Sequence, residues 1–185
     1  MSPDSTKSWV IAYDSMKQNY GLSDDAIGVF AIKLTFDVDD LKELAAESLT
    51  GGGDDKKCDV LYIDQERGIA VICQCYVGKA NKVAAKSDKA ADLNTAISWL
   101  LSADIEKLPN GIRARAEELR GAISTGKITQ VHAWYVHNLP CSANVQKELK
   151  TVEATLKSSL KNYPKSSNVN VFSKEIGTNE LQQLY

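Results

Sequence analysis

Residues 69–77 constrain the fold more than any other segment of this chain. They read Ile-Ala-Val-Ile-Cys-Gln-Cys-Tyr-Val, so apolar side chains occupy both alternating sets of positions. A strand that buries both of its faces is typical of the middle of a sheet that is covered by helices on each side. The segment therefore predicts a central strand in an α/β protein.

Three further strands are predicted, at residues 59–63, 127–137 and 168–173. The first is joined to the central strand by a short polar turn that contains glycine, which indicates an antiparallel hairpin. The last two are separated by a long helical segment at residues 142–163, and such a β-α-β unit favours a parallel pair. A mixed β-sheet flanked by helices is the expected fold class.

The amino-terminal part of the chain is predicted to be helical. Residues 5–20 carry apolar side chains at helical spacing, and Ser23 is expected to cap a second helix. Asp37 is expected to cap a third helix that ends at Thr50, before three consecutive glycines.

A helical insertion is predicted at about residues 87–125, between the second and third strands, with a break at residues 109–111. A short helix is expected after Gly177. The 185 residues fit one domain, in which residues 1–36 pack on a core made by residues 37–185.

Composition limits the classes of function. The charges nearly balance, with 22 Lys plus Arg against 24 Asp plus Glu, which argues against a dedicated nucleic-acid coat protein. An enzyme that contacts nucleic acid through a local basic patch stays compatible with this balance. No apolar run is long enough to cross a bilayer, and the amino terminus lacks the apolar region of a signal peptide. We therefore expect no membrane partner. The four cysteines are unevenly spaced, so we expect them to be reduced thiols in the cytoplasm.

A dense polar loop leads into the first predicted strand. It contains Asp54, Asp55, Lys56 and Lys57, and ends at Asp59. Carboxylates at the mouth of a sheet are suitable ligands for Mg²⁺, which prefers oxygen ligands and keeps several waters. Such a cation supports phosphodiester hydrolysis. The alternative interpretation is a solvated acidic turn.

The segments at residues 55–63 and 71–76 resemble abortive-infection phage-resistance (AIPR) proteins. The amino-terminal region of that family has an acidic loop before a strand, and then a strand that ends in Gln-Ser-Lys-Tyr. This pair is a variant of the PD-(D/E)xK motif of restriction-endonuclease-like nucleases, whose core has the order α-β-β-β-α-β. Residues 132–140 and 177–185 are similar to later parts of the same region, so the resemblance covers residues 37–185.

The resemblance implies a set of candidate catalytic residues. Asp59 corresponds to the metal-binding aspartate and Gln74 to the amide that completes a Mg²⁺ site. Asp55 corresponds to a loop acid that shapes the loop or assists at the metal. Glu47, or with less support Glu43, lies on the helix before the loop, where related nucleases often keep a further acid; a surface position is the alternative.

The motif lysine is missing from the strand. If Gln74 is the amide, the position of the lysine is Tyr76, which is a further candidate catalytic residue. If Tyr76 instead aligns with the tyrosine after the lysine, Cys75 replaces the lysine and Cys73 the amide. A tyrosine with a pKa of about 10 is a poor activator of water at neutral pH.

Several lysines offer a replacement or contacts to phosphates. Lys79, Lys82, Lys86 and Lys89 follow the strand closely, and one of them is expected to reach back to the metal or to bind backbone phosphates. Lys56 and Lys57 are expected to contact phosphates beside the acidic loop. The alternative for the later lysines is a solvated surface.

Other metal-binding residue types are better explained as structural. Cys73 and Cys75 share a strand face but lack typical zinc spacing, which favours buried apolar cysteines. His132 and His137 point to opposite faces of one strand and therefore cannot bind one metal through it.

The sequence is therefore compatible with two functions. The first is a Mg²⁺-dependent nuclease domain in phage defence. The second is a degenerate nuclease fold that binds DNA, RNA or a protein without cleavage. A further domain or a homo-oligomer is compatible with both, and without the resemblance the sequence indicates only an α/β domain.

Overall fold

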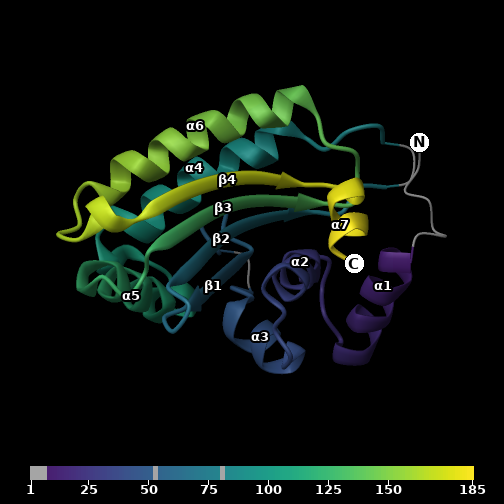
Figure 1. Cartoon of the computed structure of the whole chain (residues 1–185), viewed down its shortest axis with the longest axis horizontal. Coiled ribbons are helices and arrows are strands. Elements are labelled where there is room, and N and C mark those ends of the chain that lie inside the picture. The colour runs from purple at the N-terminus through teal and green to yellow at the C-terminus, as the bar shows by residue number, and fades with distance from the viewer. Residues whose placement is uncertain (1–7, 52–53, 80–81) are drawn as a thin grey trace.

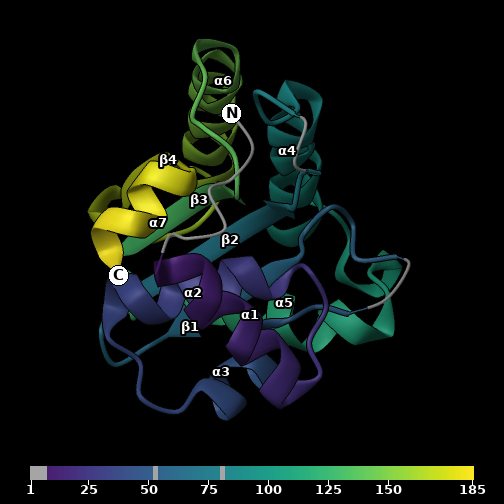
Figure 2. The same cartoon turned by 90° about the vertical axis from the view of Figure 1, so that its right-hand side faces the viewer.

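The computed structural model describes residues 8–51, 54–79 and 82–185. Its centre is a four-stranded sheet in the order β1-β2-β3-β4, with helices on both faces (Figure 1). Turned by 90°, the molecule shows α4 and α6 side by side above the sheet, and α1, α2 and α3 below it (Figure 2). The strands are β1 (Val60–Asp64), β2 (Ile69–Tyr76), β3 (Gln130–His137) and β4 (Asn170–Ile176).

The sheet is mixed. β1 pairs with β2 in the antiparallel direction, whereas β2 with β3 and β3 with β4 are parallel pairs. The predicted antiparallel hairpin and the predicted late parallel pair are both confirmed. The carboxyl ends of β2, β3 and β4 therefore meet at one edge of the sheet, which we call the carboxyl edge. Because β1 runs the opposite way, its first residues lie at the same edge.

One face of the sheet is covered by three helices, two from the predicted helical insertion and the third the predicted long helix before β4. These are α4 (Ser87–Leu101), α5 (Asn110–Thr125) and α6 (Ala143–Leu160). Their apolar sides and the sheet form one core, to which Ile72 and Tyr135 belong. We call this the α6 face.

The other face carries the remaining α-helices of the described chain. These are α1 (Ser8–Tyr20), α2 (Ala26–Phe36), α3 (Leu41–Ser48) and the short α7 (Thr178–Leu184). They enclose a second core with Val71 and Trp134 of the sheet. We call this the α2 face. β2 is buried on both faces, which confirms its predicted central position.

Two predicted helix starts are wrong. Asp37 does not cap α3; it ends α2 in the left-handed conformation, with φ of 50°. The cap of α3 is Asp40, whose side chain accepts a hydrogen bond from Glu43 N at 2.9 Å. Asp25 rather than Ser23 is the residue before α2, and no side-chain hydrogen bond caps that helix. Neighbouring aspartates offer equivalent capping groups, so composition alone did not identify the correct one.

The end of β4 also differs from the prediction. The strand continues to Ile176, beyond the predicted limit at residue 173. Lys174 and Glu175 interrupt the apolar pattern there, and Glu175 is buried only because the fold supplies it with partners. Among the described helices, none has an apolar stretch that would cross a membrane. The four cysteines are free thiols.

Candidate functional site at the carboxyl edge

Asp59 lies immediately before β1, at the carboxyl edge of the sheet. Its backbone N–H donates to the carbonyl of Cys73 at 2.9 Å, which extends the pairing of β1 with β2 by one residue. Thr50, after α3, donates to the carbonyl oxygen of Asp59 from its backbone N–H at 3.2 Å and from its hydroxyl at 3.1 Å. Two neighbouring segments therefore hold the backbone of Asp59.

The structure brings the side chains of Asp59 and Gln74 together. Oδ2 of Asp59 accepts a hydrogen bond from Nε2 of Gln74 and a second one, of 2.6 Å, from the backbone N–H of Cys75. Both side chains are buried, with exposed fractions of 9% for Asp59 and 2% for Gln74.

The thiols of Cys73 and Cys75 belong to the α2 face, 3.6 Å from each other. The sequence left open whether Gln74 or Cys73 takes the position of the motif amide. In the structure it is the side chain of Gln74 that contacts Asp59. Burial raises the pKa of the Cys75 thiol, and that of Cys58, well above the usual value. Protonated, buried thiols agree with the interpretation as small apolar residues.

The carboxyl group of Asp59 is in an unfavourable electrostatic environment. Its pKa is raised to about 7, chiefly by burial and further by the charges of Asp25 and Asp55. The hydrogen bond from the Cys75 backbone and the charge of Lys89 act in the opposite direction. A carboxylate in this environment would gain more from a bound cation than a solvated one.

Gln74 has a buried oxygen, Oε1, that finds no hydrogen-bond partner among the described residues. The same holds for the hydroxyl of Tyr135, the register partner of Gln74 on β3. Each unpaired buried polar group costs about 1–3 kcal/mol, and such groups are a common sign of a bound water or ion. The oxygen atoms of Asp59 and Gln74 are the type that Mg²⁺ prefers, so these two residues fit a hard divalent cation.

Asp55 shapes the loop. Its Oδ1 accepts a hydrogen bond from the backbone N–H of Lys57 at 2.8 Å. Lys56 and Lys57 both adopt left-handed backbone angles, with φ of 54° and 68°, which are uncommon for residues other than glycine. Asp55 thus stabilises a tight turn that leads into Asp59.

The two lysines of this loop lie against α4. The ammonium group of Lys56 lies 4.7 Å from the ring centre of Trp99 and 2.7 Å from Asp54. Lys57 lies 3.8 Å from Asp92. Their charges are therefore partly offset by contacts within the protein.

Glu47 is exposed on α3, as is Glu43. Glu47 lines a groove of about 350 Å³ together with Leu61 and Arg115. Neither glutamate is among the charges that shift the pKa of Asp59.

Lys82 contacts Tyr76, the position that the sequence resemblance assigns to the motif lysine. Its Nζ lies 2.5 Å from the hydroxyl oxygen of Tyr76 and 5.3 Å from the centre of that ring. Lys79 and Lys86 are exposed, and Lys89 lies 3.9 Å from Asp92. Of the lysines after β2, Lys82 is thus the one that the described structure joins to a residue of the motif strand.

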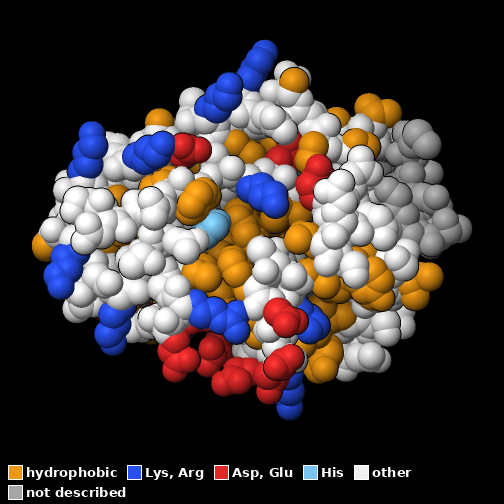
Figure 3. All heavy atoms as spheres, viewed as in Figure 1, with side chains coloured by type: hydrophobic (Ala, Val, Ile, Leu, Met, Phe, Trp, Pro, Cys, Tyr) orange, Lys and Arg blue, Asp and Glu red, His pale blue; other side chains and the backbone are white. Residues whose placement is uncertain are grey.

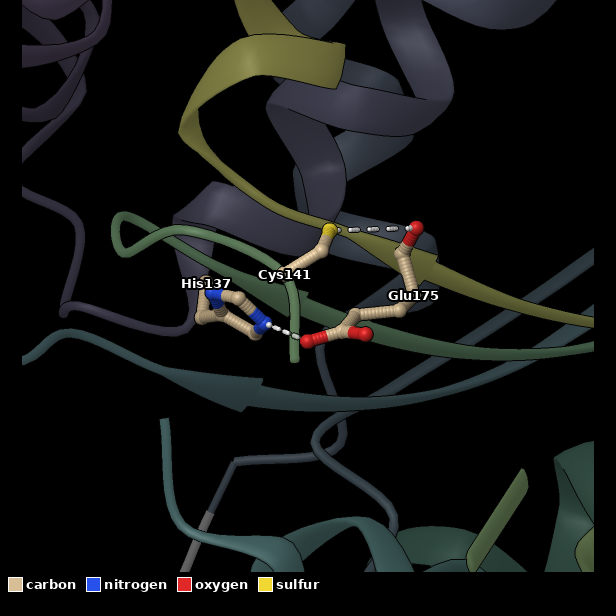
Figure 4. Close-up of side chains that lie close together, drawn as sticks. All are labelled: His137, Cys141 and Glu175. Carbon is tan, nitrogen blue, oxygen red and sulfur yellow. Dashed lines mark hydrogen bonds and ion pairs between the residues drawn. The ribbon is translucent and has the colours of Figure 1, made fainter. Parts of the chain in front are cut away.

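A second polar cluster lies further along the carboxyl edge (Figure 4). Ligand-type atoms of His137, Cys141 and Glu175 all lie within 4.8 Å of one another. The backbone N–H of Leu139 donates to Nδ1 of His137 at 3.3 Å, so Nδ1 carries no proton and Nε2 donates to Glu175 Oε1 at 3.0 Å. Glu175 also accepts from Ser142 N, at the start of α6, at 3.0 Å and 3.2 Å.

This arrangement opposes metal binding at His137. A histidine that binds metal through Nε2 carries its proton on Nδ1 and donates it to an acceptor. Here Nδ1 faces a donor, Leu139 N–H. The thiol of Cys141 donates to Glu180 Oε2 at 3.1 Å and lies 4.0 Å from the backbone carbonyl oxygen of Glu175 (Figure 4). The cluster is therefore complete as a hydrogen-bonded clamp between β3, α6 and β4, in agreement with the structural role expected for His137.

Gly177 closes the clamp. A Cβ atom there would come within 2.5 Å of the Leu139 carbonyl oxygen and 2.9 Å of Cys141 Sγ. The close approach of these backbones therefore requires the absence of a side chain.

Sequence reasoning missed three parts of this edge. Asp25, immediately before α2, raises the pKa of Asp59. The hydroxyl of Tyr135, the β3 partner of Gln74, finds no hydrogen-bond partner among the described residues, and Glu175 pairs with His137. Each depends on which elements are neighbours in space, and the available signal was the pair of charged residues, Lys174 and Glu175, near the end of β4.

Comparisons with protein-family models, with curated proteins and with solved structures gave no match for this chain. The family resemblance therefore rests on the quoted sequence motifs.

Proposed function

We propose that this chain is a Mg²⁺-dependent nuclease domain of the restriction-endonuclease-like type, with Asp59 and Gln74 as the residues that hold the cation. The observation that carries the proposal is the contact between these two side chains at the carboxyl edge. The buried Oε1 of Gln74, which lacks a partner among the described residues, supports it.

The order of elements agrees with the proposal. α3, β1, β2, β3, α6 and β4 follow one another as α-β-β-β-α-β, with α4 and α5 inserted before β3. The pairing of β1 with β2 aligns Asp59 with the end of β2, where the motif requires its acid and amide. A mixed sheet of this order is a suitable scaffold for the PD-(D/E)xK arrangement.

The residues divide the chemical tasks between them. Bound Mg²⁺ would supply polarisation of a phosphoryl oxygen and a more acidic water. Asp59 would hold the cation through its carboxylate and Gln74 through Oε1, with the amide in the orientation opposite to the one in which Nε2 donates to Asp59. Lys82, beside the hydroxyl of Tyr76, supplies the positive charge that the motif normally takes from its strand lysine.

The substrate class follows from the resemblance to AIPR proteins. The proposed substrate is DNA or RNA, and the proposed role is phage defence by abortive infection in the cytoplasm. Lys79 and Lys86, which are exposed beside the motif strand, are available for backbone phosphates.

A second candidate function is a nuclease fold that binds without cleaving. The observation that favours it is that Gln74 and the Cys75 backbone already satisfy Asp59 Oδ2, while Tyr76 occupies the place of the lysine. In this case the same edge binds a nucleic acid or a protein, and Asp59 stabilises the fold through its hydrogen bonds to Gln74 and Cys75.

The deciding experiment is a cleavage assay on supercoiled plasmid, single-stranded DNA and RNA, with Mg²⁺, Mn²⁺ or EDTA. Asp59→Asn removes the charge while keeping the shape, and Asp14→Asn, at an exposed position on α1, is the matched control. Cleavage that requires the cation and is lost only in Asp59→Asn establishes the nuclease. Binding without cleavage by the wild-type protein establishes the second candidate.

A further inference from the structure

A row of aromatic rings crosses the α2 face of the sheet. Tyr62 on β1 pairs with Val71 on β2, Val71 with His132 on β3, and His132 with Phe172 on β4. Residues that pair across strands point to the same face, so three of these four positions place a ring in one row. Phe36, the last residue of α2, lies over the row with its ring centre 6.0 Å from those of Tyr62 and His132.

The row ends on an open surface. The ring of Phe172 is stacked on His132 at 4.8 Å between ring centres, with an interplanar angle of 22°. Phe172 is 44% exposed, whereas Trp134, beside His132, is 2% exposed. Figure 3 shows hydrophobic side chains gathered around a histidine in the middle of this face, with Lys and Arg side chains on both sides. The stack thus leads from the core to solvent.

Polar side chains border the stack along β4. Asn170 and Lys174 lie two positions before and after Phe172 on the same face, and both are exposed. Gln130, the register partner of Asn170, has its side-chain oxygen 3.4 Å from Nε2 of His132. Burial, and then the charge of Lys174, lowers the pKa of His132, so that ring is neutral near pH 7.

The chemistry of this surface matches one type of partner. A flat exposed ring offers a platform for an unpaired base of any sequence. The amides of Gln130 and Asn170 offer donors and acceptors to a base edge, and Lys174 offers a cation to the adjoining phosphate. The lysine and the two amides that flank Phe172 suit a phosphate and a base edge better than they suit an apolar protein surface.

We propose that residues 130, 132, 170, 172 and 174 form a binding surface for single-stranded nucleic acid, with Phe172 as the ring on which a base stacks. This deepens the proposed nuclease function, on which its biological role rests, by naming single strands as the bound form. The surface includes no residue of the Asp59–Gln74 site, so its binding is measured without a metal.

The test is fluorescence anisotropy of the whole chain with labelled single-stranded DNA and RNA oligonucleotides in EDTA. Phe172→Ala is compared with Tyr20→Ala, because Tyr20 is similarly exposed, at 46%, on α1. Loss of one base–ring stack is expected to weaken binding about tenfold or more in Phe172→Ala, and Tyr20→Ala is expected to bind like the wild type. Circular dichroism melting confirms that both variants are folded.

A second variant tests the phosphate contact. Lys174→Gln is expected to lower the slope of log affinity against log salt by about 1, whereas Lys161→Gln, at an exposed position at the end of α6, leaves the slope unchanged. Equal binding by Phe172→Ala and Tyr20→Ala would overturn the proposal. So would tighter binding to duplex, or a dimer in light scattering that Phe172→Ala dissociates.

The two proposals fail separately. If Phe172→Ala loses binding while no cation supports cleavage, the surface stands and the nuclease fails. If cleavage requires Asp59 and a cation but Phe172→Ala binds like the wild type, the nuclease stands and the surface fails.

Discussion

The ammonium nitrogen of Lys82 lies 2.5 Å from the hydroxyl oxygen of Tyr76. Tyr76 is two residues after Gln74, on the same face of β2, at the position that the proposed motif alignment gives to the lysine. A positive charge therefore reaches this position from the segment after the strand. Sequence alignment along the strand does not detect such a replacement.

Lys82→Gln is expected to slow cation-dependent cleavage by about 10²-fold, because a charge that stabilises the transition state is typically worth this much. The same change at Lys79, which is exposed and comes earlier in the same segment, is expected to have less than about a tenfold effect. Single-turnover cleavage rates measure both. Equal effects in the two variants would show that these lysines act as general phosphate contacts.

Gln74→Glu is expected to change stability in opposite directions with and without a cation. In EDTA a second carboxylate beside Asp59 adds like-charge repulsion in a buried place, and we expect the free energy of unfolding to fall by roughly 1–3 kcal/mol. Mn²⁺ or Mg²⁺ is expected to restore the loss, since two carboxylates bind a divalent cation more tightly. Thermal unfolding with cation and with EDTA measures both effects.

The matched control for this change is Gln18→Glu, at an exposed position on α1. It adds the same charge away from the site, and its unfolding temperature is expected to stay close to the wild-type value in both solutions. A Gln74→Glu protein that no cation stabilises would argue against a cation site at Asp59 and Gln74.

The contribution of Asp59 to the stability of the metal-free protein is expected to fall as the pH rises from about 4 to about 7. The pKa of Asp59 is raised to about 7 by burial, so the folded protein binds a proton that the unfolded chain has already released. This contribution is at most about 4 kcal/mol, and it is present below the unfolded pKa and lost as the pH passes the folded one. Urea unfolding of the wild type and Asp59→Asn across this range should give curves that diverge with pH; parallel curves would contradict it.

The clamp at His137 is expected to stabilise the fold without a metal. His137→Gln leaves buried groups of Glu175 and Leu139 without their partner, which should cost about 2–4 kcal/mol of unfolding free energy. Zn²⁺ is expected to leave the unfolding temperature of the wild type unchanged. A rise with Zn²⁺ in the wild type that disappears in His137→Gln would instead identify a metal ligand.

Much of the sheet was predictable, because local patterns determine it. The apolar residues 69–77 indicated a central strand, and the polar turn after residue 63 indicated the hairpin. Boundaries were less predictable where several side chains offer the same interaction, as Asp37 and Asp40 do for the cap of α3. The last residues of β4 were missed because the burial of Glu175 depends on His137 and Ser142, which precede it by more than thirty residues.

The candidate site was predictable only in part. Asp59 and Gln74 were identified through the resemblance, and the structure joins them through the pairing of β1 and β2. The hydroxyl of Tyr135, and the stack of Phe172 on His132, depend on the register of parallel strands that are far apart in the chain. Residue periodicity gives the face of a strand, but not its neighbours.

The lack of room for a side chain at Gly177 has a consequence for evolution. A methyl group at this position would meet the Leu139 carbonyl, whereas one at Gly121 would meet nothing within 4 Å. Drift among homologues should therefore replace Gly121 freely and keep Gly177, the residue after β4. Position 177 would then be a marker by which distant descendants of this fold can be recognised, even where their loop acids have changed.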